Sequence, residues 1–287
     1  MILVTGATGH LGAATIHFLL KKMPASQVAA LVRDADKAAA LTERGVTIRV
    51  GHYDDTASLD RAMQGVEKVL LIAGTDEENR VQQHKNVVDA AKKAGVPFIA
   101  YTSRTLKDRS TMANLLMEGH FQTEDYIIAS GLTYALFRNV LYMDVIPQFV
   151  GASVFETGIH LPAGEGKVPF ALRDEMGEAM ANVLAADSSG SAIYNFTGSE
   201  GYSFADVAAV LTDLSGKRVK YTPAEPSVFE TQLAGRGVPD VIVQRVIRFL
   251  TDIKNGQEDD VYPDLENLLG RKPASLREGL KGLYNLG

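Results

Sequence analysis

The chain begins Met1-Ile2-Leu3-Val4-Thr5-Gly6-Ala7-Thr8-Gly9-His10-Leu11-Gly12, a short apolar strand that runs into a glycine-rich turn. A helical pattern starts at the third glycine. In such a strand–turn–helix unit the first glycine permits the tight turn and the second lets the backbone approach a phosphate, while the third lets the helix pack on the strand. Unpaired N–H groups at the helix start favour an anion. We therefore predict a pyrophosphate site, and a glycine turn without a ligand is the weaker alternative. The predicted contacts are Gly6, Ala7, Thr8, Gly9, His10, Leu11 and Gly12.

Beyond this turn, strand-type apolar runs alternate with helix-length amphipathic segments. The expected strands are Ile2–Thr5, Val28–Val32, Val46–Val50, Lys68–Ile72, Phe98–Thr102 and Thr133–Arg138. The expected helices are Gly12–Lys22, Asp36–Arg44, Ala57–Gln64, Arg80–Ala94 and about Met112–Ser130. Near-continuously apolar strands are buried on both faces. The alternation therefore predicts an α/β fold, a doubly wound parallel sheet of the Rossmann type, with ligands at the carboxyl ends of the strands.

The alternation breaks after about residue 139, where loops marked by glycine and proline become frequent. We expect a dinucleotide-binding Rossmann domain over residues 1–139 and a smaller, mainly substrate-side region over residues 140–287. Glu175–Ala186 reads as a helix packed on the sheet and Ala192–Thr197 as a further core strand. Residues of about 175–197 are therefore expected to return to the first domain.

The end of the second strand reads Leu31-Val32-Arg33-Asp34, where an enzyme that prefers NAD usually carries an acidic residue for the ribose 2′-hydroxyl. Arg33 offers a planar fork of donors that suits a phosphate, and Lys37 lies one helical turn beyond it. The pattern favours NADPH over NADH. The alternative is that Arg33 and Lys37 are merely solvated at a helix start. A small shift of the chain would also place Asp34, instead of Arg33, beside the ribose.

The third strand ends in Gly51-His52-Tyr53-Asp54-Asp55. Tyr53 and Asp54 are candidates to cover an adenine ring and to accept from its amino group. Asp54 or Asp55 could equally be the N-cap of the following helix. Both interpretations can hold for adjacent residues.

The composition excludes several classes of function. The 287 residues carry a net charge of −6 with scattered basic residues, so direct nucleic-acid binding is not expected. Cysteine is absent, which removes disulfides and thiolate metal sites, and the six histidines show no ligand spacing, so no metal is predicted. No targeting segment or membrane-length apolar run is recognisable, from which we expect a cytoplasmic protein that does not engage a membrane.

Several stretches together resemble the NmrA-like atypical short-chain dehydrogenases/reductases, and the resemblance spans most of the chain. The stretches are 6–12, 31–33, 51–54, 94–96, 101–103 and 138–142. Residues 22–27 and 120–124 are similar to the bacterial NAD(P)H:quinone oxidoreductase and triphenylmethane reductase type. The resemblance implies a Rossmann fold, a dinucleotide site and reduction of conjugated acceptors.

The same resemblance implies further site residues. It places Ala73 and Gly74 along the cofactor, followed by Thr102 and Ser103, and puts Asn139 and Tyr142 at the nicotinamide end. His120 is a candidate for the substrate pocket, with a helix-surface position as the equal alternative. His10 either touches a phosphate or faces solvent.

The chain departs from ordinary short-chain dehydrogenases, whose tyrosine acid is followed four residues later by a lysine. No tyrosine here has that lysine: Tyr126 is followed at this spacing by Ser130. Phe121 and Asp125 stand where a related pair would be. Alcohol oxidation and sugar epimerisation by a Tyr-Lys pair are therefore not expected.

We accordingly predict an NADPH-dependent reductase that transfers hydride directly to a planar, quinone-like acceptor. Such a reaction relies on proximity and orientation more than on proton transfer. The alternative is a redox sensor that binds NAD(P) without turnover and reports to a regulatory protein partner. A homo-oligomer is possible under either hypothesis.

Overall fold

The computed structural model describes residues 1–76, 78–151, 153–187 and 190–286. The chain divides into two compact units. The first comprises residues 1–104, 116–139 and 173–195, and the second comprises residues 105–115, 140–172 and 196–287. Each unit is described by itself.

The first unit is built on a seven-stranded sheet of order β3-β2-β1-β4-β5-β6-β8, and the strands from β1 to β6 pair in parallel. The strand bounds are β1 Ile2–Val4, β2 Val28–Val32, β3 Thr47–Val50, β4 Lys68–Leu71, β5 Phe98–Arg104, β6 Thr133–Asn139 and β8 Ala192–Phe196. Strands β1, β2 and β5 are buried along their whole length, as expected for strands covered on both faces. The predicted Rossmann-type α/β fold is thereby confirmed.

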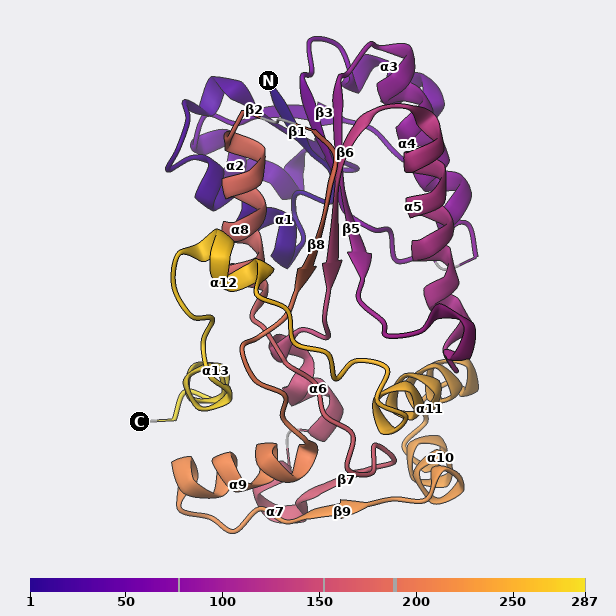
Figure 1. Cartoon of the computed structure of the whole chain (residues 1–287), viewed down its shortest axis with the longest axis vertical. Helices are drawn as coiled ribbons and strands as arrows, with labels where there is room; N and C mark the ends of the chain where they lie inside the picture. The colour runs from indigo at the N-terminus through magenta and orange to yellow at the C-terminus, as the bar shows by residue number, and fades with distance from the viewer. Residues whose placement is uncertain (77, 152, 188–189, 287) are drawn as a thin grey trace. The chain divides into compact units, whose positions relative to one another are not determined.

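Helices cover both faces of this sheet, with α1, α2 and α8 on one face and α3, α4 and α5 on the other (Figure 1). Their bounds are α1 His10–Leu19, α2 Ala39–Glu43, α3 Thr56–Ala62, α4 Arg80–Lys93, α5 Glu118–Ser130 and α8 Arg173–Ala185. On the face covered by α3, α4 and α5, the helix residues Leu59, Val88 and Ile127 pack against Leu71 and Tyr101 of the sheet. This buried apolar layer holds the carboxyl ends of β4 and β5 in place.

An ion pair fixes α5 to the sheet. Arg138 on β6 donates from Nε and Nη2 to the two carboxylate oxygens of Glu124, at 3.0 and 2.6 Å. Glu124 is buried, so the bidentate pair satisfies a charge that would otherwise be costly to bury. Helix α5 therefore has a defined position over β5 and β6.

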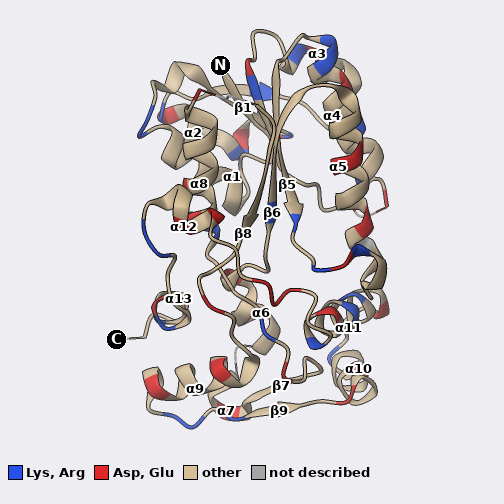
Figure 2. Cartoon of the chain, in the orientation of Figure 1, with Lys and Arg blue, Asp and Glu red and all other residues tan. Residues whose placement is uncertain are grey.

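The second unit contains a small parallel pair of strands, β7 and β9, and several helices. The bounds are β7 Ile159–Leu161, β9 Tyr221–Pro223, α6 Ile146–Val150, α7 Val154–Thr157, α9 Phe204–Ser215, α10 Pro226–Gly235, α11 Asp240–Lys254, α12 Asp264–Leu269 and α13 Leu276–Leu283. Helices α9 and α13 each begin with a capping box, Ser203 with Asp206 and Ser275 with Glu278. Both units carry interspersed basic and acidic residues (Figure 2).

Two helix predictions need correction. The predicted helix at Asp36–Arg44 is a short 3-10 turn (Asp36–Ala38) followed by α2. The helix predicted to begin at about Met112 begins instead at Glu118. The backbone N–H groups of Ala113 and Asn114 donate to the carboxylate of Asp252 on α11, so they are committed to a partner distant in sequence. Residues 105–115, expected in the first domain, accordingly fall in the second unit.

None of the helices in the described ranges is long and apolar enough to cross a membrane.

Candidate cofactor site

The strand order locates the candidate site. The strands lie in the order β3-β2-β1-β4-β5-β6 across the sheet. The chain therefore runs outward from β1 to β3 on one side and from β4 to β6 on the other. Ligands of open α/β sheets bind at such a reversal, outside the carboxyl ends of the strands. The glycine turn follows β1 and the loop 72–74 follows β4, so these two segments flank the reversal.

The glycine turn has the geometry expected of a phosphate-binding loop. Gly6 has φ +56°, a left-handed conformation that side chains rarely adopt, and its carbonyl accepts from the Gly9 N–H at 3.0 Å. A Cβ on Gly12 would lie 2.4 Å from the Gly6 oxygen and 2.9 Å from the Ala7 Cα. Gly12 therefore lets α1 start directly against the turn.

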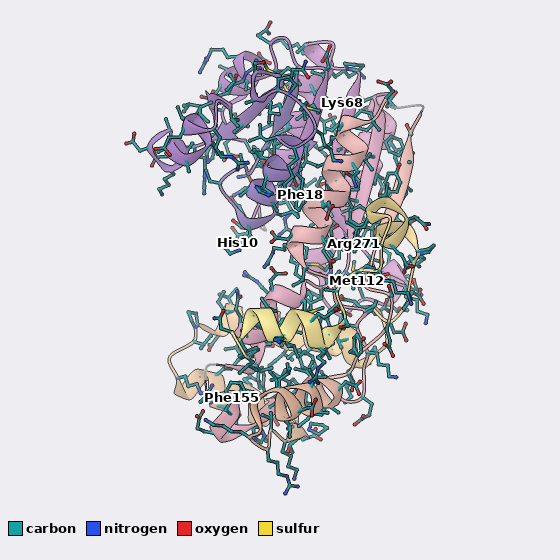
Figure 3. All side chains as sticks on the ribbon, turned by 90° about the vertical axis from the view of Figure 1, so that its left-hand side faces the viewer. His10, Phe18, Lys68, Met112, Phe155 and Arg271 are labelled. Carbon is teal, nitrogen blue, oxygen red and sulfur yellow. The ribbon has the colours of Figure 1, made fainter. Side chains whose placement is uncertain are left out.

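The first turn of α1 is open to an anion. Its N-cap is Gly9, which has no side chain to cap the helix, and no acidic residue stands in the first turn. Thr8, Gly9 and His10 are exposed, and Figure 3 shows His10 at the beginning of the helix. Ala7 and Leu11 are buried in the core, so they can offer only backbone groups. A pyrophosphate fits this donor set.

The end of β2 carries the predicted specificity residues. Arg33 and Lys37 are both exposed. Asp34, the alternative contact, accepts from the Asp36 N–H at 3.0 Å and so stabilises the turn that follows.

The structure after β3 shows which of Asp54 and Asp55 is the N-cap of the following helix, a question that the sequence left open. Asp55 is the N-cap of α3, because its carboxylate accepts from the Ser58 N–H at 3.0 Å. Asp54 accepts from the Gln83 amide at 3.0 Å. The Tyr53 hydroxyl donates to the Thr5 hydroxyl and lies 3.0 Å from the Ile72 carbonyl. Burial raises the pKa of Tyr53 well above its usual value. The adenine role of Tyr53 and Asp54 stays a prediction.

Side chains hold the loop after β4 at three successive residues. The Ile72 N–H donates to the Thr5 hydroxyl and the Ala73 N–H donates to the Thr102 hydroxyl, both at 2.9 Å. The Gly74 N–H donates to Nε2 of His84 at 3.0 Å. Since these N–H groups are committed, the predicted contacts of Ala73 and Gly74 with a cofactor would be made by carbon atoms and carbonyls.

The predicted substrate residue His120 lies inside the first unit. Its Nδ1 is 2.9 Å from the Tyr101 hydroxyl, and a second hydrogen bond reaches the Thr102 backbone. Burial, together with the nearby Arg80, lowers the pKa of His120 well below its usual value. Burial also raises the pKa of Tyr101. Neither group changes charge near neutral pH, and the substrate role of His120 stays a prediction.

The remaining predicted residues lie at the ends of β5 and β6 or beyond them. Ser103 and Asn139 are buried, and the register pairs Ser103 with Arg138 and Arg104 with Asn139. The ends of the two strands are therefore level. Tyr142 belongs to the second unit, where it forms a parallel bridge with Ala171. The site roles of Ser103, Asn139 and Tyr142 stay predictions.

The tyrosine that was compared with the catalytic tyrosine of short-chain dehydrogenases is engaged elsewhere. The Tyr126 hydroxyl donates to Asp89 on α4 at 2.8 Å, and this bond is the main reason that the pKa of Tyr126 is raised. A raised pKa makes the phenol a poorer acid. Within the described ranges, no group of three or more His, Asp or Glu side chains is arranged to hold a metal ion.

The sequence pattern did not single out four residues that hold the site segments, namely Thr5, Arg80, Gln83 and His84. Arg80 and His84 stand four residues apart at the start of α4, a spacing that places two polar side chains on one helix face. That spacing was a readable signal. Their target, the Gly74 peptide, could be recognised only once the loop was placed.

The chain is similar to known proteins along its whole length. The model of the NmrA-like family matches residues 1–283. The chain belongs to the NmrA-like family. It is 37% identical over 287 residues to quinone oxidoreductase 2 of Escherichia coli (strain K12), which covers 100% of this chain and 99% of that protein. The resemblance inferred from the sequence is thereby confirmed.

Two solved structures align along nearly the whole chain. The NADPH complex of the E. coli NADPH-dependent quinone oxidoreductase matches with a TM-score of 0.94 and 36% identity, covering 99% of this chain and 100% of that one. The Citrobacter sp. triphenylmethane reductase complexed with NADP(H) matches with a TM-score of 0.92 and 35% identity, with coverage of 99% and 100%.

Proposed function

We propose that this NmrA-like protein is an NADPH-dependent reductase that transfers hydride to a quinone-like, planar conjugated acceptor. The match to quinone oxidoreductase 2 over the whole length of both chains carries the proposal. The geometry of the first unit supports it. An uncapped helix start follows the glycine turn, and exposed Arg33 and Lys37 stand at the end of the neighbouring strand.

The chain's own residues supply binding and orientation in this proposal. The amides of the glycine turn and of the α1 start receive the pyrophosphate. Arg33, supported by Lys37, receives the 2′-phosphate as a fork of charged donors. NADPH, once bound, supplies the hydride.

The acceptor takes two electrons and one proton as hydride, and the second proton that completes a hydroquinone comes from water. A quinone is electron-poor, so it accepts hydride without a strong acid beside it. This agrees with the state of the buried groups near the loop after β4. His84 and His120 are neutral with lowered pKa values, and Tyr53 and Tyr101 are weak acids with raised ones.

The test is NADPH oxidation by the purified protein, followed by cofactor absorbance with a panel of quinones and triphenylmethane dyes. Turnover with at least one planar acceptor is expected. Tight NADPH binding without oxidation by any acceptor would reject the reductase and favour the redox-sensor alternative.

A further inference from the structure

One helix holds both polar backbone groups of Gly74. The Gly74 N–H donates to Nε2 of His84 at 3.0 Å, and Nε of Arg80 donates to the Gly74 carbonyl at 2.9 Å. Arg80 is the first residue of α4 and His84 is one turn further along, so both side chains face the loop. Both are buried, with exposed fractions of 6% and 0%. The Gly74 peptide is thus clamped from two directions.

The hydrogen bonds around His84 define its tautomer. Because Nε2 accepts from the Gly74 N–H, the ring proton is on Nδ1. Nδ1 lies 3.0 Å from the Thr123 hydroxyl, and that hydroxyl donates to the Gly119 carbonyl at 2.8 Å. The chain of bonds therefore runs in one direction, from the loop after β4 through α4 to α5. Thr123 presents an acceptor to Nδ1 and so keeps Nε2 free to accept.

The clamped loop stands at the reversal of strand order. It extends β4, whose neighbour β1 leads into the glycine turn. The turn and the loop lie close together, since a Cβ added to Gly6 would lie 3.2 Å from the Ile72 Cβ. The loop therefore forms one wall of the crevice in which the sheet topology places a ligand.

We propose that Arg80 and His84 are positioning residues of the dinucleotide site, which fix the Gly74 peptide before the cofactor binds, and that Thr123 sets the tautomer that His84 needs. The inference rests on the proposed function for the identity of the cofactor. A loop that is ordered beforehand does not have to be ordered at binding, and that saving appears as affinity.

Two substitutions at one position separate the two bonds of His84. In His84→Gln the amide oxygen can take the place of Nε2 and accept from the Gly74 N–H. In His84→Asn the shorter side chain can place its amide nitrogen only where Nδ1 was, so the Gly74 N–H loses its acceptor. The first measurement is amide hydrogen exchange at Gly74 by NMR, without cofactor. We expect protection close to that of the unaltered protein in His84→Gln and a loss of about tenfold or more in His84→Asn.

The second measurement is the Kd for NADPH of each folded variant, well below its melting temperature. We expect a rise of about tenfold in His84→Asn and a much smaller rise in His84→Gln. A purely structural role would lower the melting temperature and leave the Kd of the folded protein unchanged. Thr123→Val, which removes the acceptor for Nδ1, should behave like His84→Asn, and Thr123→Ser should rescue both measurements.

These measurements test separately whether the clamp on Gly74 exists and whether it contributes to NADPH binding. Full protection of Gly74 in His84→Asn would overturn the clamp. An exposed Gly74 amide with an unchanged Kd for NADPH would overturn its role in the site. If the unaltered protein bound no NADPH, the proposed function and the positioning role would fall together, while exchange at Gly74 would still decide whether the clamp exists.

Discussion

At the scale of single residues, Arg33 is the side chain that we predict to distinguish the two nicotinamide cofactors. It is exposed at the end of β2, whereas its neighbour Asp34 is committed to the Asp36 N–H. We expect NADPH to bind more tightly than NADH, and Arg33→Ala to remove most of the difference. A hydrogen bond to a charged group is worth about 1.5–3 kcal/mol, or about ten- to a hundredfold in affinity.

Calorimetric titration of both proteins with both cofactors measures this difference, and the exposed Arg44→Ala serves as a control. Equal affinities of the unaltered protein for NADPH and NADH would contradict the assignment of Arg33.

Two glycines of the turn should fail in different ways. Gly9 has ordinary backbone angles, φ −80° and ψ 164°, and a Cβ there would meet only the Gly6 oxygen at 3.3 Å. Gly9→Val should therefore stay folded and lose dinucleotide binding, because its side chain occupies the approach to the phosphates. Gly12→Ala should lower the melting temperature as well, since its Cβ would clash with backbone atoms at 2.4 and 2.9 Å. Thermal melts and titration calorimetry on both variants test this, and retained binding in Gly9→Val would place the phosphates elsewhere.

His84 should make folding stability depend on pH. Burial lowers the pKa of His84 to about 3 in the folded protein, from an ordinary value of 6.5. Between these values the unfolded chain binds a proton that the folded chain does not, so stability is lost as pH falls, by about 1.4 kcal/mol per pH unit at most. The charged and titratable groups around His84 do not oppose this trend: Arg80 disfavours its charge, His120 has a pKa lowered well below its usual value, and Tyr53 and Tyr101 stay protonated.

The check is urea unfolding from pH 7 to pH 4. His84→Gln should show a shallower decline than the unaltered protein, and exposed His17→Gln should not. Parallel declines in all three proteins would show that His84 titrates normally.

At the scale of elements, the local pattern predicted most strands and the placement of their carboxyl ends. Runs such as Val28–Val32 and Phe98–Thr102 are apolar throughout, and that property alone marks a strand buried on both faces. The start of α5 could not be predicted in this way. Residues 112–117 are compatible with a helix, and only the distant Asp252 carboxylate removes the first backbone amides from it.

This attachment of residues 105–115 can be tested at Asp252. Asp252 is 2% exposed, and its carboxylate accepts from the backbone N–H groups of Ala113 and Asn114, the latter at 3.0 Å. Asp252→Asn replaces one charged acceptor with a donor that faces an N–H group. We expect the free energy of unfolding to fall by about 1–3 kcal/mol. Chemical denaturation measures it, with exposed Glu225→Gln in the same unit as the control, and an unchanged midpoint would show that the carboxylate is dispensable.

At the scale of the whole molecule, the sequence predicted the fold and indicated candidate binding segments, but it did not predict the contacts that hold these segments in place. The glycine turn and Arg33 are recognisable because their roles depend on backbone position in a strand–turn–helix unit. The bonds of Gly74 to Arg80 and His84, and of Tyr53 to Thr5, join side chains and loops through the packed sheet. Such pairings depend on register and helix rotation, which no local pattern contains.

The titratable groups near the candidate site together determine how the hydride step should depend on pH. The pKa values of His84 and His120 are lowered well below the usual value of a histidine, while those of Tyr53, Tyr101 and Tyr126 are raised above the usual value of a tyrosine. Hydride transfer from NADPH to a quinone should therefore be nearly independent of pH between about 6 and 8.

General acid catalysis typically raises a reaction rate about a hundred- to ten-thousandfold, so a reaction that does not use it can be recognised by kinetics. Tyr126→Phe should lower kcat by less than about tenfold, because its hydroxyl serves a bond to Asp89. Asn139→Leu should cost more, because Asn139 is a buried polar residue at the predicted nicotinamide end of β6. Single-turnover absorbance measurements across the pH range give the hydride step directly. A bell-shaped profile, or loss of quinone reduction in Tyr126→Phe with the Kd for NADPH intact, would reveal a proton donor and reject a site that works by positioning alone.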